Sequence, residues 1–271
     1  MKSSFPMCAI GDVCVVIAGQ HIASNLYNQE GLGIPYLTGP ADFGDVKPTI
    51  SKWTNSPKVF ASIQDVLLTV KGNGVGKSNL GVDAAIGRQL MALRPSRKIE
   101  QSYLFHFVKA HEKYFFGLAQ GATVPGISKS DVAQACIPLP PLEEQRRIAA
   151  ILDKADSVQR KRQEAIRLTE ELLRSRFLEM FGDPVRNPKG WKVKPLGEVS
   201  ESKLGKMRWK ENITGVNLVP YLGNSHVRWR SFDLSNLPEM DFTESELEKL
   251  DLRNGDLIVC EGGEVGRCAI W

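Results

Sequence analysis

The chain has 271 residues, of which 42% are hydrophobic and 24% charged, and its formal net charge is +4. These values are typical of a globular protein with one or two domains. No run of about 18 apolar residues occurs, which excludes a membrane-spanning helix, and the first residues lack the apolar stretch of a secretory signal. Five scattered cysteines without a Cys-x-x-Cys pair indicate reduced thiols, so we expect a cytoplasmic protein.

The positive charge lies mainly in the first half of the chain. Residues 1–141 have a net charge of +4, residues 142–181 of +1 and residues 182–271 of −1. A basic first half is compatible with a polyanionic partner such as nucleic acid, although many proteins with this balance bind none.

The stretch LLTVKGNGVGKSNL, residues 67–80, resembles a phosphate-binding P-loop, because an apolar run leads into Gly76-Lys77-Ser78. The P-loop pattern Gly-x-x-x-x-Gly-Lys-[Ser/Thr] requires a glycine at position 71. That position is Lys71, and the nearest glycine is Gly72. The spacing argues against an NTP site, and we interpret the glycines as turn residues.

Two further segments complete the first part of the chain. The sequence QSYLFHFVKAHEKYFFGLAQ predicts a helix over residues 101–120, and a segment ending in IPLPP follows it at residues 121–141. The prolines of this segment restrict the backbone and predict an extended conformation before the next element.

Residues 142–182 carry the clearest helix signal. No proline or glycine occurs from Leu142 to Phe181, and Gly182 follows as a stop signal. A helix of this length would be roughly 60 Å long, which is more than a globular domain needs. It is either a long amphipathic helix packed on its own domains or a spacer that requires a second helix, and its length favours the spacer.

Apolar residues follow this helix at coiled-coil-like spacing, although Arg162, Thr169 and Arg176 interrupt the seam. An exposed apolar seam leads to the hypothesis that the chain dimerises through the helix. The candidate interface residues are Leu142, Ile148, Ile151, Leu152, Ala155, Val158, Ala165, Ile166, Leu172, Leu173, Phe177 and Met180.

Three sequence blocks recur in the same order on both sides of the helix, at offsets of about 186, 185 and 190 residues. The pairs are AIGDVCVV (9–16) and PLGEVSES (195–202), GIPYLTG (33–39) and LVPYLGN (218–224), and SIQDVLLTVKGNGVGK (62–77) and LRNGDLIVCEGGEVGR (252–267). The chain is therefore predicted to be α+β: a mixed α/β domain at 1–141, a long helix at 142–182, and an incomplete second copy of the domain at 183–271.

The sequences IPLPPLEEQRRIAAILD (137–153) and FLEMFGDP (177–184), together with the paired blocks, resemble the specificity subunit of type I restriction–modification systems. The resemblance implies two target recognition domains, each reading half of a bipartite double-stranded DNA site. It also implies that two antiparallel helices act as the spacer between them. Residues 1–141 match the first recognition domain, 142–182 the central spacer helix and 183–271 the truncated second domain.

The same resemblance implies that this chain is not an enzyme and binds no cofactor. It would dock DNA methyltransferase subunits, which use S-adenosylmethionine, and through them restriction subunits, which use ATP and Mg²⁺. The sequence agrees, because it contains no His-Glu-x-x-His, no Gly-x-Ser-x-Gly and no methyltransferase Pro-Pro-Tyr/Phe motif. We therefore expect no catalytic residue and no metal site.

Candidate DNA-binding residues combine positive charge, amides and aromatic rings in presumed loops or strands. They are Lys47, Lys52 and Trp53; Lys71, Asn73, Lys77, Ser78 and Asn79 around an exposed glycine turn; His226, Arg228 and Arg230 on one face of a strand; and Arg267 in the second glycine motif. Each could equally be an ordinary solvated residue. A helical protein–protein scaffold that reads no DNA is the alternative function.

Overall fold

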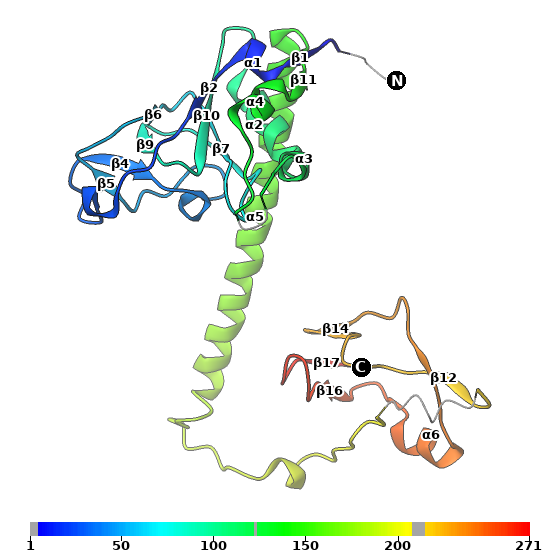
Figure 1. Cartoon of the computed structure of the whole chain (residues 1–271). Coiled ribbons are helices and arrows are strands. Elements are labelled where there is room, and N and C mark those ends of the chain that lie inside the picture. The colour runs from blue at the N-terminus through cyan, green and yellow to red at the C-terminus, as the bar shows by residue number, and fades with distance from the viewer. Residues whose placement is uncertain (1–4, 122–123, 208–214) are drawn as a thin grey trace. The chain divides into compact units, whose positions relative to one another are not determined.

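The computed structural model describes residues 5–121, 124–207 and 215–271. The chain divides into two compact units, Met1–Met180 and Phe181–Trp271. Figure 1 shows the elements of both, and each unit is described by itself below.

A four-stranded antiparallel sheet forms the centre of the first unit. Its strands, in spatial order, are β2 (Cys14–Ala18), β10 (Leu90–Pro95), β7 (Val66–Thr69) and β8 (Ser78–Leu80). All four residues of β7 are buried. Its run of apolar and β-branched side chains suits a strand that is covered on both faces.

The first unit contains a second, five-stranded sheet, whose strands come from the part of the sequence between β2 and β10. Its spatial order is β3 (Tyr27–Asn28), β5 (Trp53–Thr54), β4 (Ile34–Leu37), β9 (Ala84–Ile86) and β6 (Phe60–Ala61). The β4–β9 pair is parallel and the other pairs are antiparallel. The first unit is thus a mixed α/β domain, as predicted.

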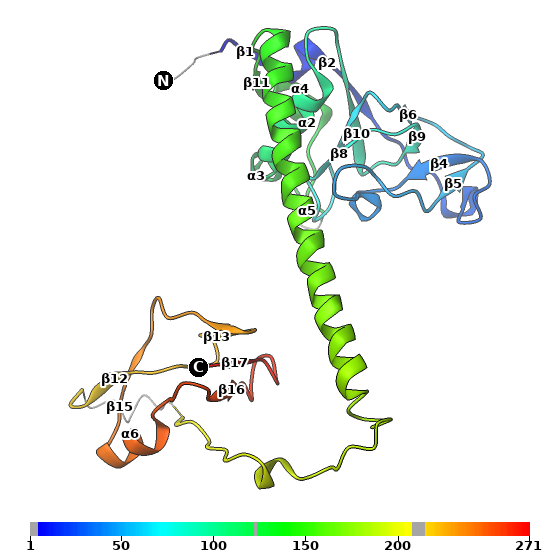
Figure 2. The same ribbon diagram turned by 180° about the vertical axis from the view of Figure 1, so that it is seen from behind.

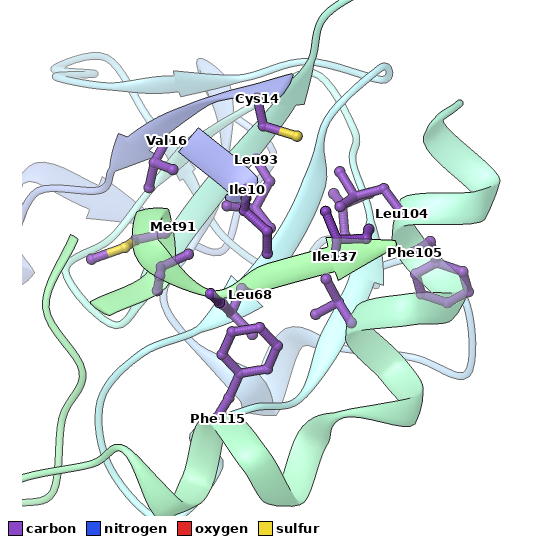
Figure 3. Packing of buried hydrophobic residues seen from close by; sticks show 14 of the residues in the cluster. Ile10, Cys14, Val16, Leu68, Met91, Leu93, Leu104, Phe105, Phe115 and Ile137 are labelled. Carbon is purple, nitrogen blue, oxygen red and sulfur yellow. The ribbon is translucent and has the colours of Figure 1, made fainter. Parts of the chain in front are cut away.

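The main core lies between the four-stranded sheet and the helices. These helices are α1 (Ile10–Val13), α2 (Gln101–Ala110), α3 (Glu112–Gly117) and α4 (Lys129–Gln134), and a short ribbon of β1 (Met7–Ala9) with β11 (Cys136–Pro138) joins them. Figure 3 shows Leu68 and Leu93 of the sheet packed with Leu104, Phe105 and Phe115 of the helices. Short 3-10 turns occur at Ser24–Leu26 and Pro40–Asp42.

The single helix predicted over residues 101–120 is wrong in one respect, because His111 divides it into α2 and α3. The ring Nδ1 of His111 lies 2.8 Å from the carbonyl oxygen of Phe107, and the two rings stack at 4.1 Å. A side chain that bonds the backbone one turn earlier competes with regular helix geometry. Phe115 of α3 still reaches the core and is fully buried.

The long helix α5 is Leu142–Phe181, with the bounds that the sequence predicts. It ends at Gly182, whose φ of 80° is the left-handed conformation that favours glycine. Its first turns lie along α2 and α4, and the rest extends beyond the domain (Figure 2). Gln145 and Ala149 are its buried residues.

The second unit consists of short elements. They are a 3-10 turn at Leu196–Glu198, helix α6 (Glu244–Leu250), and the paired strands β12 (Leu218–Pro220) with β15 (Glu239–Asp241), β13 (Val227–Arg228) with β14 (Ser231–Phe232), and β16 (Leu257–Val259) with β17 (Cys268–Ile270). A small core of Val227, Cys260 and Ala269 holds the last two pairs together.

The predicted duplication is present in the backbone of the two glycine hairpins, β7–β8 and β16–β17. Both are antiparallel, and their registers superpose with an offset of 190 or 191 residues. The equivalent hydrogen bonds are Gly76 N–H to Thr69 O and Gly266 N–H to Cys260 O, Lys77 N–H to Gly74 O and Arg267 N–H to Glu264 O, and Thr69 N–H to Lys77 O and Cys260 N–H to Arg267 O. The loop of the second hairpin is one residue shorter, so that Asn73 has no counterpart.

The two hairpins differ in how far their apolar side chains are covered. Val66 and Leu68 of β7 are fully buried, because β10 pairs with this strand and the helices pack on it. Their counterparts Leu257 and Val259 are 60% and 52% exposed. Among the described residues, β16 has no strand partner except β17. The apolar side chains of the second hairpin are therefore less covered than those of the first.

Candidate nucleic-acid interface

The glycine turn that raised the NTP-binding question is the loop of a β-hairpin. In the residues that join β7 to β8, Gly72 and Gly76 have φ of 86° and 92°. A P-loop runs from a strand into the N-terminus of a helix, where backbone N–H groups surround the phosphate. Here the chain runs into the antiparallel strand β8. The backbone therefore does not have the geometry of a P-loop, in agreement with the spacing.

Lys71, Asn73 and Lys77 project from this turn and are exposed. Within the described part of the chain, none of the three side chains forms a hydrogen bond or ion pair. The segment after α3 supports the turn, since the Gly72 N–H donates to the carbonyl of Pro125 at 2.9 Å. Two cations and an amide are thus presented on a fixed backbone, which suits contacts to phosphates or base edges.

The prediction that Ser78 and Asn79 belong to an exposed turn is wrong. Asn79 is 2% exposed, and its side chain exchanges two hydrogen bonds with the backbone of Gly44, at 3.1 and 2.9 Å. The hydroxyl of Ser78 is also buried. Both residues begin strand β8, and Asn79 fastens the loop at Gly44 to it, so a structural role accounts for Asn79.

The second candidate stretch is divided between surface and interior. Lys47 is exposed, and Trp53 is half-buried in β5. Lys52 is not free, because its Nζ lies 3.2 Å from Oδ1 of Asp42 and donates to the hydroxyl of Thr38 at 3.0 Å. The prediction that Lys52 contacts DNA is therefore corrected, because its ammonium group is bonded within the protein.

Asp42 is the acceptor at the centre of this cluster and is 5% exposed. Its Oδ2 accepts the backbone N–H of Thr38 at 2.6 Å and the Thr38 hydroxyl at 2.7 Å. Burial acts to raise the pKa of Asp42, but the hydrogen bonds from Thr38 and Lys52 outweigh it and hold the pKa below its ordinary value. Lys52 thus neutralises a buried carboxylate.

In the second unit, the predicted strand face is only partly correct. His226 and Arg228 flank the buried Val227, as alternation requires. Strand β13 ends at Arg228, however, and Arg230 lies in the following turn with a φ of 65°. Arg230 therefore does not continue that face, although it is exposed.

Arg267 occupies the position of Lys77 in the second hairpin, yet its environment differs. One guanidinium nitrogen donates to the carbonyl of Asn224 at 2.6 Å, and another lies 3.1 Å from Oε2 of Glu264. Its side chain is 16% exposed. The prediction that Arg267 contacts DNA is therefore corrected too. Its guanidinium group joins the turn to the segment at Asn224.

The candidate interface residues of α5 fall into two groups. Leu142 and Ile148 are half-buried, and Ile148 packs against the core of its own domain. Ile148 is therefore an intramolecular contact, which corrects its assignment to a partner interface. The other ten are exposed: Ile151, Leu152, Ala155, Val158, Ala165, Ile166, Leu172, Leu173, Phe177 and Met180. The helix is thus packed on its domain at one end and presents an apolar seam along the rest.

The sequence reasoning missed the polar contacts that join α5 to α2. Gln145 and Asp153 of α5 bond residues at the start and in the middle of α2. The only signal in the sequence is that Asp153 and Asp156 are three residues apart and so share a helix face. Nothing in the sequence indicates which helix that face contacts.

The described residues show neither a metal-binding cluster nor a membrane-spanning helix. They contain no cluster of three or more His, Cys, Asp or Glu side chains that could hold a metal ion. Within them, no helix is both long enough and apolar enough to cross a membrane.

Comparison with known families gives one match over most of the chain. Residues 3–169 match the family described as the type I restriction modification DNA specificity domain. The match covers the first unit from its first strand to beyond the middle of α5.

The chain is similar to several proteins that are described as specificity subunits of type I restriction enzymes. The type I restriction enzyme MjaVIII specificity subunit of Methanocaldococcus jannaschii is 26% identical over 267 residues, which is 92% of this chain and 62% of that protein. The EcoKI specificity subunit of Escherichia coli K12 is 27% identical over 73% of this chain and 47% of its own length. The putative type I restriction enzyme MjaX specificity subunit of Methanocaldococcus jannaschii is 35% identical over 156 residues, which is 56% of this chain. The chain thus spans 36% of the MjaX subunit and 62% of the MjaVIII subunit.

Two solved structures extend the comparison. The HsdS subunit from Thermoanaerobacter tengcongensis is 37% identical, with a TM-score of 0.53 over 61% of this chain and 40% of that one. The S subunit of a type I restriction–modification system from M. genitalium is 20% identical, with a TM-score of 0.52 over 82% of this chain and 61% of that one. The second likeness supports the fold alone.

Proposed function

The chain belongs to the type I restriction–modification DNA specificity family, and we propose that it recognises a DNA sequence for a restriction–modification complex. The observation that carries the proposal is a mixed α/β domain packed on the first turns of the 40-residue helix α5. The region that matches the family covers this domain and the helix as far as residue 169. The helix holds the domain away from other parts of a complex, and the domain presents unpaired cations on its surface.

Within this proposal, the glycine turn of the first domain contacts DNA. Lys71 and Lys77 bind phosphates and Asn73 reaches a phosphate or base edge, because these side chains are exposed and have no partner in the described part of the chain. Lys47 is a further candidate, because its side chain is exposed on the first unit. In the second unit, His226 Nδ1 accepts the Gly223 N–H at 3.0 Å and Arg228 lies 3.6 Å from Oδ2 of Asp233, so these two are weaker candidates. Lys52, Asn79 and Arg267 are excluded, because their polar groups bond within the protein.

The chain supplies no catalysis of its own in this proposal. DNA methyltransferase subunits that use S-adenosylmethionine dock on it, and restriction subunits that use ATP and Mg²⁺ join through them. The complex acts on cellular DNA in the cytoplasm. The exposed seam of α5 supports a second helix beside it, and we propose a homodimer through this seam.

A salt titration tests the DNA contacts. Binding of the chain with its methyltransferase subunit to a cognate duplex is measured by fluorescence anisotropy from low to physiological salt. Because each neutralised phosphate contributes about 0.9 to the slope of log K against log salt, the double variant K71A/K77A should reduce the slope by about 1.8. Methyltransferase binding should be unchanged.

The matched control is R97A/K98A, which also removes two exposed cations. These residues follow the Pro95 end of β10, whereas the glycine turn follows Thr69, which pairs with the opposite end of β10 at Leu90. The slope should therefore stay unchanged in the control. Equal slopes for K71A/K77A and wild type would refute the phosphate contacts. Equal affinity of the wild-type complex for cognate and random duplexes would instead favour the protein–protein scaffold.

A further inference from the structure

The contact between α2 and α5 contains a row of polar pairs. Ser102, His106 and Lys109 lie on one face of α2, because they are four and three residues apart. Both Oδ atoms of Asp153 accept the Ser102 hydroxyl at 3.0 Å, and His106 Nε2 lies 2.7 Å from Asp153 Oδ1. Lys109 Nζ donates to Asp156 Oδ2 at 2.6 Å. Two carboxylates of α5 thus engage three residues of α2.

A second anchor lies at the start of α5. Gln145 is fully buried, and its Oε1 accepts the backbone N–H of Glu100, the residue before α2, at 2.8 Å. Its Nε2 donates to the carbonyls of Lys98 and Pro140, at 3.1 and 2.8 Å. One amide therefore joins the beginning of α5 to the beginning of α2.

The separation of the two anchors determines what they can do. Asp153 and Asp156 follow Gln145 by eight and eleven residues, which is about 12 and 16 Å along the helix axis. A single anchor at Gln145 permits the domain to tilt about it, whereas a second anchor at that distance prevents the tilt. From residue 161 to residue 176 every side chain of α5 is exposed. Among the described residues, no hydrogen bond or ion pair joins α2 to the part of α5 between Asp156 and residue 176.

Asp153 is 57% exposed at its side chain. Exposed polar pairs such as Lys109–Asp156 contribute little to folding stability. His106 is buried, so its bond to Asp153 contributes more. All of these pairs have defined lengths and directions. Apolar packing at Ile148 and Ala149 tolerates sliding and rotation more easily than three directed hydrogen bonds do. The polar pairs are therefore better suited to fixing the angle between the domain and α5 than to stabilising the fold of the domain.

We infer that Asp153 and Asp156 are positioning residues that hold the recognition domain at one angle on the spacer helix. This orientation follows from the contacts alone. Its consequence rests on the proposed function: a fixed angle sets where the DNA-contacting surface lies relative to the helix, and hence the gap that a bipartite site must have.

Spin-label distance measurement tests the inference without DNA. Nitroxides are attached through ketone-bearing residues introduced at exposed positions 88 and 175, so that the five native cysteines stay unlabelled. The wild-type chain should give one narrow distance distribution between domain and helix. D153A/D156A should broaden it at least about twofold. The variant should lose some stability, because His106 is buried and loses its acceptor, but cooperative thermal unfolding should show that it remains folded.

Two comparisons make the result specific. E170A removes a carboxylate of the same helix that has no side-chain partner among the described residues, and it should leave the distribution narrow. D153N/D156N keeps a carbonyl acceptor at both positions and should restore most of the narrow distribution. If D153A/D156A does not fold, S102A/K109A removes the partners from the domain side and should broaden the distribution in its place.

A distribution as narrow in the folded alanine variant as in wild type would overturn the inference, and so would equal broadening in E170A. Because the measurement uses no DNA, its outcome is independent of the proposed function. A chain that binds no specific DNA but loses its fixed angle in D153A/D156A would refute the proposed function and leave the inference standing.

Discussion

At the scale of single residues, Asp42 shows how a buried charge is tolerated in the first domain. The carboxylate accepts hydrogen bonds from the backbone N–H and hydroxyl of Thr38, and Lys52 supplies the opposite charge. Removing one member of such a cluster leaves buried polar groups without partners, which costs more than the net value of the bonds. Lys52 and Thr38 therefore stabilise the loop around Asp42 by pairing with its carboxylate.

The first prediction concerns the pH dependence of this cluster. The folded-state pKa of Asp42 lies below its ordinary value of 3.8. A lowered pKa contributes stability above the ordinary value, and this contribution is lost as the pH falls below it through the folded-state pKa. We expect D42N to lower the free energy of unfolding by about 2 kcal/mol at pH 7. Chemical denaturation measures the difference in unfolding free energy between wild type and D42N at pH 7 and at pH 3. The difference should be smaller at pH 3, because part of the carboxylate contribution is lost there.

The control for this prediction is D45N, three residues further along the chain. Asp45 is exposed and its side chain has no hydrogen-bond partner among the described residues. D45N should therefore leave unfolding unchanged at both pH values. A difference between wild type and D42N that is as large at pH 3 as at pH 7 would show that the carboxylate charge is not the cause.

The second prediction separates the two positive-φ glycines of the turn. A Cβ at Gly76 would lie 2.4 Å from the carbonyl oxygen of Glu112, whereas a Cβ at Gly72 would have no atom within 4 Å. G72A should cost only the left-handed backbone strain, about 1 kcal/mol, and G76A should cost about 3 kcal/mol because the backbone must also shift. Thermal unfolding compares them, and equal losses would contradict the packing of the turn on α3.

At the scale of elements, α5 combines two surfaces on one helix. Its first turns are fastened to α2 by Gln145, Asp153 and Asp156, and its later turns present Ile166, Leu172 and Leu173 to solvent. The same element therefore belongs to the domain at one end and offers a partner surface at the other. Helical stability comes largely from packing. The later turns of α5, which pack on nothing among the described residues of the domain, should therefore be less stable than its first turns.

The third prediction tests the partner surface. Burying a leucine or isoleucine side chain contributes roughly 1.5–3 kcal/mol, so the seam should make the chain associate with rising concentration in sedimentation velocity. I166E/L173E should shift the association to at least about tenfold higher concentration. R174E, which makes a similar charge change outside the seam and about 100° around the helix from Leu173, should not. A monomer at all concentrations would contradict the homodimer.

Elements of this chain differ in how far they follow from local sequence. The bounds of α5 are predictable because the absence of proline and glycine, and the stop at Gly182, are local features. The break between α2 and α3 depends on one side chain of His111 bonding the carbonyl of Phe107, which residue propensities do not report. The burial of Asn79 depends on a loop 35 residues away in the chain, and such long-range pairing has no local signal.

At the scale of the whole molecule, the duplication preserves backbone geometry more than surface chemistry. The two glycine hairpins share their registers and turn hydrogen bonds. Lys77 of the first hairpin is exposed, whereas Arg267 of the second bonds Asn224 and Glu264. The repeated glycines thus predicted the fold of both hairpins correctly, but they could not predict which of the cations is available. A shared turn does not imply a shared DNA contact.

Selection of a DNA sequence is the function proposed for this chain, and mapping of DNA methylation in cells is its most direct test. Cells that lack other methyltransferases of this type would express the methyltransferase subunit with the chain, without it, or with K71A/K77A. We expect one methylated sequence motif that appears only when the chain is expressed and that is methylated less with K71A/K77A. A methylated motif that is the same with and without the chain would contradict the proposed function.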